Sequence, residues 1–135
     1  MYLLDTNVVS ELRRPRPHRA VLDWIGAVPA EQLFLSAVTV GEIQAGIEIT
    51  REQDEAKAAE LEDWLNKVLA SYAVLPLDAH AFREWARIMH RRSDTLAEDA
   101  MIAAIAKIHR LTVVTRNVDD FDRLGVALQN PFIQG

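Results

Sequence analysis

The chain opens with Leu3–Leu4–Asp5–Thr6–Asn7, and this stretch decides the fold that we expect for the rest. A short apolar strand, Tyr2 to Leu4, runs directly into an aspartate. The next two residues, Thr6 and Asn7, are short polar side chains that favour helix caps and turns, and an apolar run follows. The pattern predicts a strand–turn–helix junction with a carboxylate at the carboxyl end of the strand, where open α/β sheets bind ligands. Taken alone, Asp5 is explained equally well as a cap of the following helix.

The composition is that of an ordinary globular protein. The chain has 135 residues, of which 50% are hydrophobic and 26% are charged, so we expect a single domain spanning residues 1–135. No apolar run has the length of a membrane span, and no signal-peptide pattern is present, so we expect a cytoplasmic protein with no membrane partner. The absence of cysteine excludes disulfides and zinc–thiolate sites.

The basic residues are clustered, although the net charge of −5 argues against bulk attraction to nucleic acid. A local basic patch beside an acidic pocket is compatible with a polyanionic substrate. The alternative for either cluster is a solvated helix face. The two clusters are Arg13, Arg14, Arg16, His18 and Arg19, and Arg87, His90, Arg91 and Arg92.

Apolar runs of strand length alternate with helical patterns along the whole chain. This alternation predicts an α/β fold: a three-layer α/β/α sandwich with a central parallel sheet covered on both faces. We expect Trp24, Trp64 and Trp85 to lie in the core or an interface, because each is spaced helically with aliphatic residues. The predicted strands are 2–4, 33–35, 74–77, 111–115 and 126–128, and the longer predicted helices are 38–49, 51–72, 78–92 and 96–109.

Two further acids occupy unusual positions. Glu42 lies early in the helix after the second strand, and Asp99 lies in the first turn of a helix that is apolar nearly all round. Neither has a lysine or arginine three or four residues away. A carboxylate on an apolar face is unfavourable unless something pairs with it. The helix dipole stabilises an acid in the first turn by only about 0.3–1 kcal/mol. A divalent cation shared with Asp5 would resolve this conflict.

Carboxylate oxygens and water are the ligands that Mg²⁺ and Mn²⁺ prefer. Such a cation would polarise a phosphoryl oxygen and activate water, so the acids with their basic flanks indicate metal-dependent phosphodiester hydrolysis. Scattered capping acids and other metal chemistry remain alternatives. The lone histidines show no paired spacing, and we expect them to be structural or exposed; they are His18, His80, His90 and His109.

Four ordered motifs resemble the PIN-domain family, and more closely the VapC and FitB ribonuclease toxins of bacterial toxin–antitoxin modules. The resemblance covers essentially the whole chain. It rests on Leu3-Leu4-Asp5-Thr6-Asn7, on Leu35-Ser36-Ala37-Val38-Thr39-Val40-Gly41-Glu42, on Asp99-Ala100-Met101-Ile102-Ala103-Ala104, and on Thr112-Val113-Val114-Thr115-Arg116-Asn117 with Asp120-Phe121.

This resemblance implies a Mg²⁺- or Mn²⁺-dependent endoribonuclease whose core acids are Asp5, Glu42 and Asp99. It also implies a homodimer or a larger toxin–antitoxin assembly, RNA as substrate, and a cognate antitoxin that contacts DNA. Asn117 stands where the family often has an aspartate, which puts a second metal in doubt and gives Asp119 or Asp120 a possible assisting role.

The remaining candidates surround these acids. Thr6, Asn7 and Thr115 are candidates for orienting carboxylates or water, and Arg116 for contacting substrate phosphate or an antitoxin carboxylate. Because of Asn117, a catalytically weakened protein-binding module is the second reading. A phospho-acceptor signalling domain is a weaker third, because it needs a lysine after the last core strand and this chain has Arg116 there.

Overall fold

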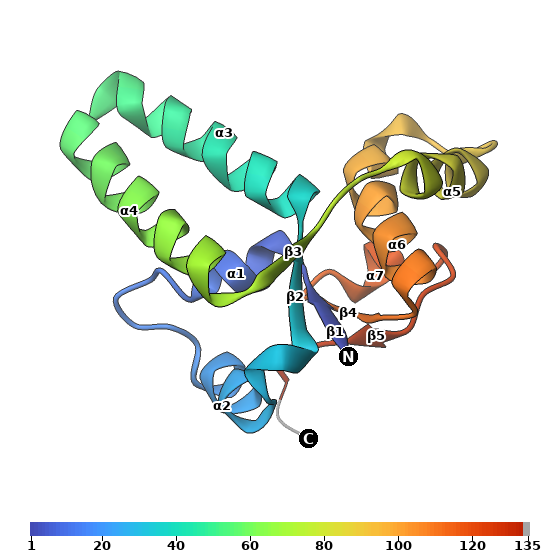
Figure 1. The fold of residues 1–135 in the computed structure, drawn as a ribbon, viewed down its shortest axis with the longest axis horizontal. Helices are drawn as coiled ribbons and strands as arrows, with labels where there is room; N and C mark the ends of the chain where they lie inside the picture. Colours follow the sequence, from blue (N-terminus) through green and yellow to red (C-terminus); the bar gives the residue numbers. More distant parts are fainter. Residues whose placement is uncertain (134–135) are drawn as a thin grey trace.

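The computed structural model describes residues 1–133. Its five parallel strands form one sheet in the order β3-β2-β1-β4-β5, with helices packed around it (Figure 1). The strands are β1 (Tyr2–Leu4), β2 (Leu33–Ser36), β3 (Ala73–Leu75), β4 (Thr112–Val114) and β5 (Leu128–Gln129). The helices are α1 (Thr6–Glu11), α2 (Arg19–Ala27), α3 (Ala37–Gln53), α4 (Glu55–Ser71), α5 (Ala79–Met89), α6 (Ala97–His109) and α7 (Val118–Phe121), with short 3-10 turns at Ala30–Gln32 and Asp94–Leu96.

The opening strand β1 lies at the centre of the sheet. Leu3 pairs in register with Phe34 of β2 on one side and with Val113 of β4 on the other. The carboxyl ends of these three strands therefore meet at one edge. The prediction that the chain is organised around its first stretch is confirmed in this sense.

The two faces of the sheet carry separate hydrophobic cores, because successive side chains of a strand point to opposite faces. Leu3 and Val113 pack with buried residues of α5, α6 and α7, among them the fully buried Phe121. Leu4 packs on the other face with residues of α1, α2 and α4. The predicted three-layer α/β/α arrangement is confirmed.

The helix predicted over residues 51–72 is α4, but it begins four residues later than predicted, at Glu55. Arg51 belongs to the last turn of α3, and the chain breaks at Asp54, whose extended backbone separates α3 from α4 and whose carboxylate accepts a hydrogen bond from the Lys57 N–H. The two helices form a hairpin with its own small core of Ile47, Ala58 and Leu65. This antiparallel packing accompanies a break at Asp54, a few residues after the boundary predicted near Thr50.

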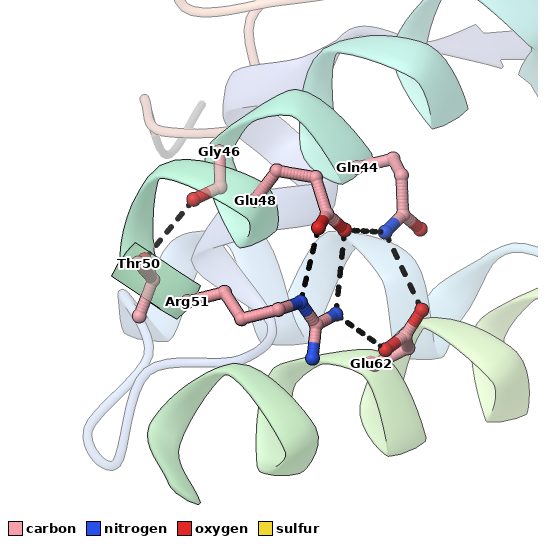
Figure 2. A network of polar contacts seen from close by, with 6 residues as sticks. All are labelled: Gln44, Gly46, Glu48, Thr50, Arg51 and Glu62. Carbon is pink, nitrogen blue, oxygen red and sulfur yellow. Dashed lines mark hydrogen bonds and ion pairs between the residues drawn. The ribbon is translucent and has the colours of Figure 1, made fainter. Parts of the chain in front are cut away.

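Polar contacts hold the same hairpin together on its outer side (Figure 2). The Arg51 guanidinium donates to Glu48 of its own helix and, at 2.7 Å, to Glu62 of α4. Gln44 donates to both of these glutamates. This network joins α3 to α4 and fixes the direction in which α3 leaves the sheet.

The other predicted elements are found with small shifts at their ends. The helix predicted over 78–92 is α5, which begins after the Asp78 cap and ends at Met89, and the helix predicted over 96–109 is α6, whose central residues are buried. Trp24, Trp64 and Trp85 pack, partly buried, against the cores, as predicted. Among residues 1–133 we find no helix with the length and apolarity of a membrane span.

Candidate active site

Asp5 lies at the carboxyl end of the central strand and is held there by three hydrogen bonds. Its side chain is 4% exposed. One oxygen accepts from the Thr6 N–H at 2.8 Å, which caps α1, and the other accepts from the Thr115 hydroxyl at 2.8 Å and the Asn7 amide at 3.3 Å. Burial raises the pKa of Asp5, and these hydrogen bonds oppose the rise without cancelling it.

Thr115 and Asn7 join the ends of β1 and β4. The Thr115 hydroxyl, fully buried, donates to Asp5 and accepts from the Asn117 N–H at 2.9 Å. The Asn7 side-chain oxygen accepts from the Arg116 N–H at 3.2 Å. Both side chains therefore orient the Asp5 carboxylate, and their hydrogen bonds also connect the first turn after β4 to the start of α1.

Glu42 approaches the same edge from the second turn of α3. The Thr6 hydroxyl lies 3.1 Å from Glu42 Oε1 and 3.0 Å from Thr39 Oγ1. A hydroxyl carries one proton and the carboxylate is the stronger acceptor, so the proton goes to Glu42. Thr6 thus links the helix after β1 with the helix after β2.

Burial also dominates the titration of Glu42 and raises its pKa to about 7. The hydrogen bond from Thr6 opposes this rise. The carboxylates of Glu98, Asp5 and Asp99 add to it, in that order. The pKa of Glu42 is therefore raised by acids from two other segments of the chain, the end of β1 and the start of α6.

Asp99 stands in the first turn of α6 and completes the group from the third side. Burial raises its pKa to about 6, and the nearby charges of Asp5, Asp120 and Glu98 contribute to the rise. The structure therefore brings together all three acids that the sequence singles out. Their mutual repulsion is the sign that a positive charge would be bound favourably among them.

The donor set fits a hard divalent cation such as Mg²⁺ or Mn²⁺, because the approaching groups are carboxylates and hydroxyls with no thiolate or imidazole. As the side chains lie, no three histidine, aspartate or glutamate groups within residues 1–133 form a ready-made metal cage. Mg²⁺ tolerates this, because it usually keeps several waters and takes only one or two carboxylates directly. The half-buried Glu42 and Asp99 have room to rotate towards the rigid Asp5.

Two hollows meet at Glu42. One, of about 640 Å³, runs between α3 and α6 and is lined by Glu98 and Met101 on the α6 side. The other, of about 170 Å³, lies between α1 and the α3–α4 hairpin, with Arg13 and Trp64 in its wall. Glu42 is thus open to solvent from both sides of α3.

Four predicted residues after β4 lie outside the group of Asp5, Glu42 and Asp99. Arg116 is exposed, and its guanidinium lies over the ring of Phe132, 4.5 Å from the centroid. Asn117 is exposed at the start of α7, and only its backbone N–H takes part in the network. Asp120, also exposed, lies near enough to raise the pKa of both Asp5 and Asp99, whereas Asp119 lines a neighbouring surface hollow with Arg116.

Sequence reasoning missed Ser36, Thr39 and Glu98. The Ser36 hydroxyl donates to the Thr39 hydroxyl at 3.2 Å, and Thr39 is fully buried beneath Thr6. The available signal was the Ser-x-x-Thr pattern directly after β2, which reads as a helix cap. Glu98 could have been found from its place beside Asp99 in the same helical turn.

The chain is similar over nearly its whole length to three known proteins. The chain is 40% identical to the plasmid stability protein StbB of Pseudomonas syringae, 37% identical to the VapC ribonuclease Y4jK of Sinorhizobium fredii and 36% identical to the toxin FitB of Neisseria gonorrhoeae. Each match covers 98% of this chain and 98–99% of the relative.

Solved structures show the same fold. A structure of FitAB bound to the IR36 DNA fragment matches with a TM-score of 0.87 at 34% identity, over all of this chain and 98% of the other. A toxin–antitoxin complex from Klebsiella pneumoniae matches with a TM-score of 0.73 at 25% identity, over 97% of this chain and 98% of the other. The PIN domain model matches residues 2–127, and the chain belongs to the PIN domain family.

Proposed function

We propose that this protein is a divalent-metal-dependent endoribonuclease that acts as the toxin of a toxin–antitoxin module. The observation that carries the proposal is the meeting of Asp5, Glu42 and Asp99 at one sheet edge, each with its pKa raised by burial. The relatives named as a ribonuclease and as a toxin, similar over their whole length, support the choice of RNA and of the toxin role.

We assign Mg²⁺ or Mn²⁺ to the three acids. When bound, the cation supplies a Lewis acid for a phosphoryl oxygen and makes water easier to deprotonate. Asp5 gives a fixed oxygen because Thr115, Asn7 and the Thr6 N–H hold its carboxylate. Glu42 and Asp99 add the second and third carboxylates, and the Thr6 hydroxyl holds one oxygen of Glu42.

Asp120 takes the fourth acidic position in this proposal. Asn117 supplies no carboxylate, but its N–H holds Thr115, which in turn holds Asp5. Asp120 is the acid of α7 that acts on both Asp5 and Asp99. It therefore replaces the missing side chain as an outer ligand through water.

We further propose a cognate antitoxin as protein partner, a homodimer as the assembling unit, and DNA contact only through the antitoxin. The complexes among the structural matches support this. Arg116 is exposed beside the acids, so it is placed to meet a substrate phosphate or an antitoxin carboxylate. Because the substrate is RNA, we expect the reaction to take place in the cytoplasm, within a single domain that spans residues 1–135.

The test is cleavage of a structured RNA pool by the purified protein with Mg²⁺, Mn²⁺ or EDTA. We expect metal-dependent cutting that Asp99→Asn abolishes and that Asp63→Asn, the same change at an exposed position on α4, leaves intact. Cutting by Asp99→Asn at the wild-type rate would refute the metal assignment.

A catalytically weakened binding module is the second candidate. The observation that favours it is that the acids within residues 1–133 form no ready-made cage for an ion. Titration calorimetry with Mn²⁺ separates the two candidates. Absence of Mn²⁺ binding together with absence of cutting would establish the binding module.

A further inference from the structure

A second surface gathers positive charge on this acidic protein. Two shallow hollows, of about 210 and 280 Å³, adjoin one another beside the ends of α5 and α6, and they share Lys107 and Gly125 in their walls. We call this the basic surface. Its five cationic residues are Arg87, Arg92, Lys107, Arg110 and Arg123.

These residues come from four separate segments, and only Arg87 and Arg92 belong to one of the clusters seen in the sequence. Arg87 lies on α5, Arg92 lies in the loop that follows it, Lys107 and Arg110 lie at the end of α6, and Arg123 lies in the turn after α7. All five are exposed. Because four segments contribute these positively charged side chains, the surface is not explained as the solvated face of a single helix.

The charge of the basic surface is only slightly compensated. Glu84 pairs with Arg87 at 3.1 Å and with Lys107 at 3.2 Å, and it is the one carboxylate among the described residues that line the two hollows. Within residues 1–133, Arg110 and Arg123 form no ion pair. On a chain of net charge −5, such a concentration of like charge is unfavourable unless a polyanion binds there.

Part of the basic surface is also held in place. The Arg92 guanidinium donates to the carbonyl oxygen of Arg123 at 2.7 Å and to that of Ile88 at the end of α5. These bonds cap α5 and fix the turn that carries Arg123. Arg110 adopts a left-handed backbone conformation, φ 57°, as the C-cap of α6. The side chains therefore start from ordered backbone positions and not from a mobile loop.

The basic surface lies at the opposite end of α6 from the candidate active site, beside the amino ends of β4 and β5. Arg123 follows Asp120 by three residues, and Asp120 is near enough to Asp5 and Asp99 to raise their pKa values. Along α6, Asp99 and Lys107 are separated by a rise of about 12 Å. An extended strand with its scissile phosphate at the acids would therefore run along α6 to reach the basic surface.

We infer that the basic surface binds the backbone phosphates of single-stranded RNA flanking the cleaved bond. This inference rests on the proposed ribonuclease function and adds the path that the strand follows away from the acids. Guanidinium forks suit phosphate oxygens, and contacts to phosphate contribute affinity without sequence preference. The surface thus supplies binding energy, while the acids select the bond that is cut.

The test measures binding of a fluorescein-labelled single-stranded RNA by anisotropy in the Asp99→Asn background, where the RNA stays intact. The test variant is Arg110→Asn with Arg123→Gln, in which asparagine tolerates the left-handed conformation at position 110. The control is Arg16→Gln with Arg19→Gln, which removes the same charge from exposed positions in the other basic cluster. Thermal melts check that both variants fold.

We expect the test variant to bind RNA about tenfold more weakly and to lose about 1.4 from the slope of log K against log salt, since each lost phosphate contact removes about 0.7. The control keeps the wild-type affinity and slope. Without Asp99→Asn, the test variant cleaves more slowly at limiting RNA and normally at saturating RNA.

Equal binding by the test variant and the parent would overturn the inference, as would a loss confined to the control. A test variant that loses affinity for poly-glutamate but not for RNA would assign the surface to an acidic protein segment instead. If the wild-type protein cleaves RNA while the test variant binds normally, the inference fails and the proposed function stands. If the wild-type protein neither cleaves nor binds RNA, both fail.

Discussion

Glu42→Gln is the most informative single change in the acid group. Glutamine has nearly the same shape as glutamate and its side-chain oxygen can still accept the hydrogen bond from the Thr6 hydroxyl. The change removes only the charge. It therefore isolates the electrostatic cost of holding an ionised carboxylate at this edge of the sheet.

The magnitude follows from the pKa of about 7 against the ordinary value of 4.5 for a glutamate. Because the folded state binds the proton more tightly than the unfolded state, the wild-type protein is relatively more stable below about pH 4.5 and loses stability as pH rises to about 7. The undiscounted shift corresponds to about 3.4 kcal/mol. Glu42 is only half-buried, so solvent screening reduces this to about 1.5 kcal/mol.

The assay is urea unfolding in EDTA at pH 5 and pH 8.5. We expect Glu42→Gln to match the wild-type protein within about 0.5 kcal/mol at pH 5 and to exceed its free energy of unfolding by about 1.5 kcal/mol at pH 8.5, or by about 5 °C in melting temperature. Glu52→Gln, an exposed position on the same helix, is the matched control. A difference that does not vary with pH would refute the electrostatic reasoning.

Three other changes test the site and the core. Thr115→Val removes the donor to Asp5 and the acceptor for the Asn117 N–H. We expect it to lower the free energy of unfolding in urea by about 1–3 kcal/mol and to weaken Mn²⁺ binding measured by calorimetry, whereas Thr115→Ser stays close to wild type. Normal Mn²⁺ binding by Thr115→Val would refute the orienting role. Mg²⁺ at about ten times its Kd should stabilise the wild-type protein by about 1.4 kcal/mol but leave the melting temperature of Asp5→Ala unchanged, and an equal rise in both would remove Asp5 from the ligand set. Ile105→Ala, at a fully buried position, should cost about 2–5 kcal/mol in urea unfolding, whereas Ile49→Ala, 66% exposed, should cost little; similar losses would contradict the assignment of the core.

The layers of the fold were predictable because apolar runs of strand length alternate along the chain with helical patterns, and each pattern identifies its own type of element. The division into two helices was also predicted, but its position at Asp54 was not. Residues 51–55 are all charged or polar and suit an exposed helix, so Asp54, although a favoured N-cap residue, does not stand out from its neighbours as the break. The break is set by the contact of Ile47 with Ala58 and Leu65 across the hairpin, which is a tertiary effect.

The acids of the site were predictable for an energetic reason. An unpaired carboxylate on an apolar helix face is unfavourable, so Glu42 and Asp99 stood out without any structure. The hydroxyls that lie behind Thr6 did not stand out, because Ser36 and Thr39 at the start of α3 satisfy an ordinary capping pattern. Only the fold shows that Thr39 also lies against Thr6 of another helix.

The same contacts explain how the chain accommodates Asn117. What Thr115 receives from position 117 is a backbone N–H, and every residue except proline provides one. The side chain at 117 can therefore change without disturbing the Thr115 hydroxyl or the Asp5 carboxylate that it orients. Asp120, in the same short helix, keeps a negative charge beside Asp5 and Asp99. The orientation of Asp5 therefore does not depend on which side chain stands at position 117, and an asparagine there is compatible with an intact metal site.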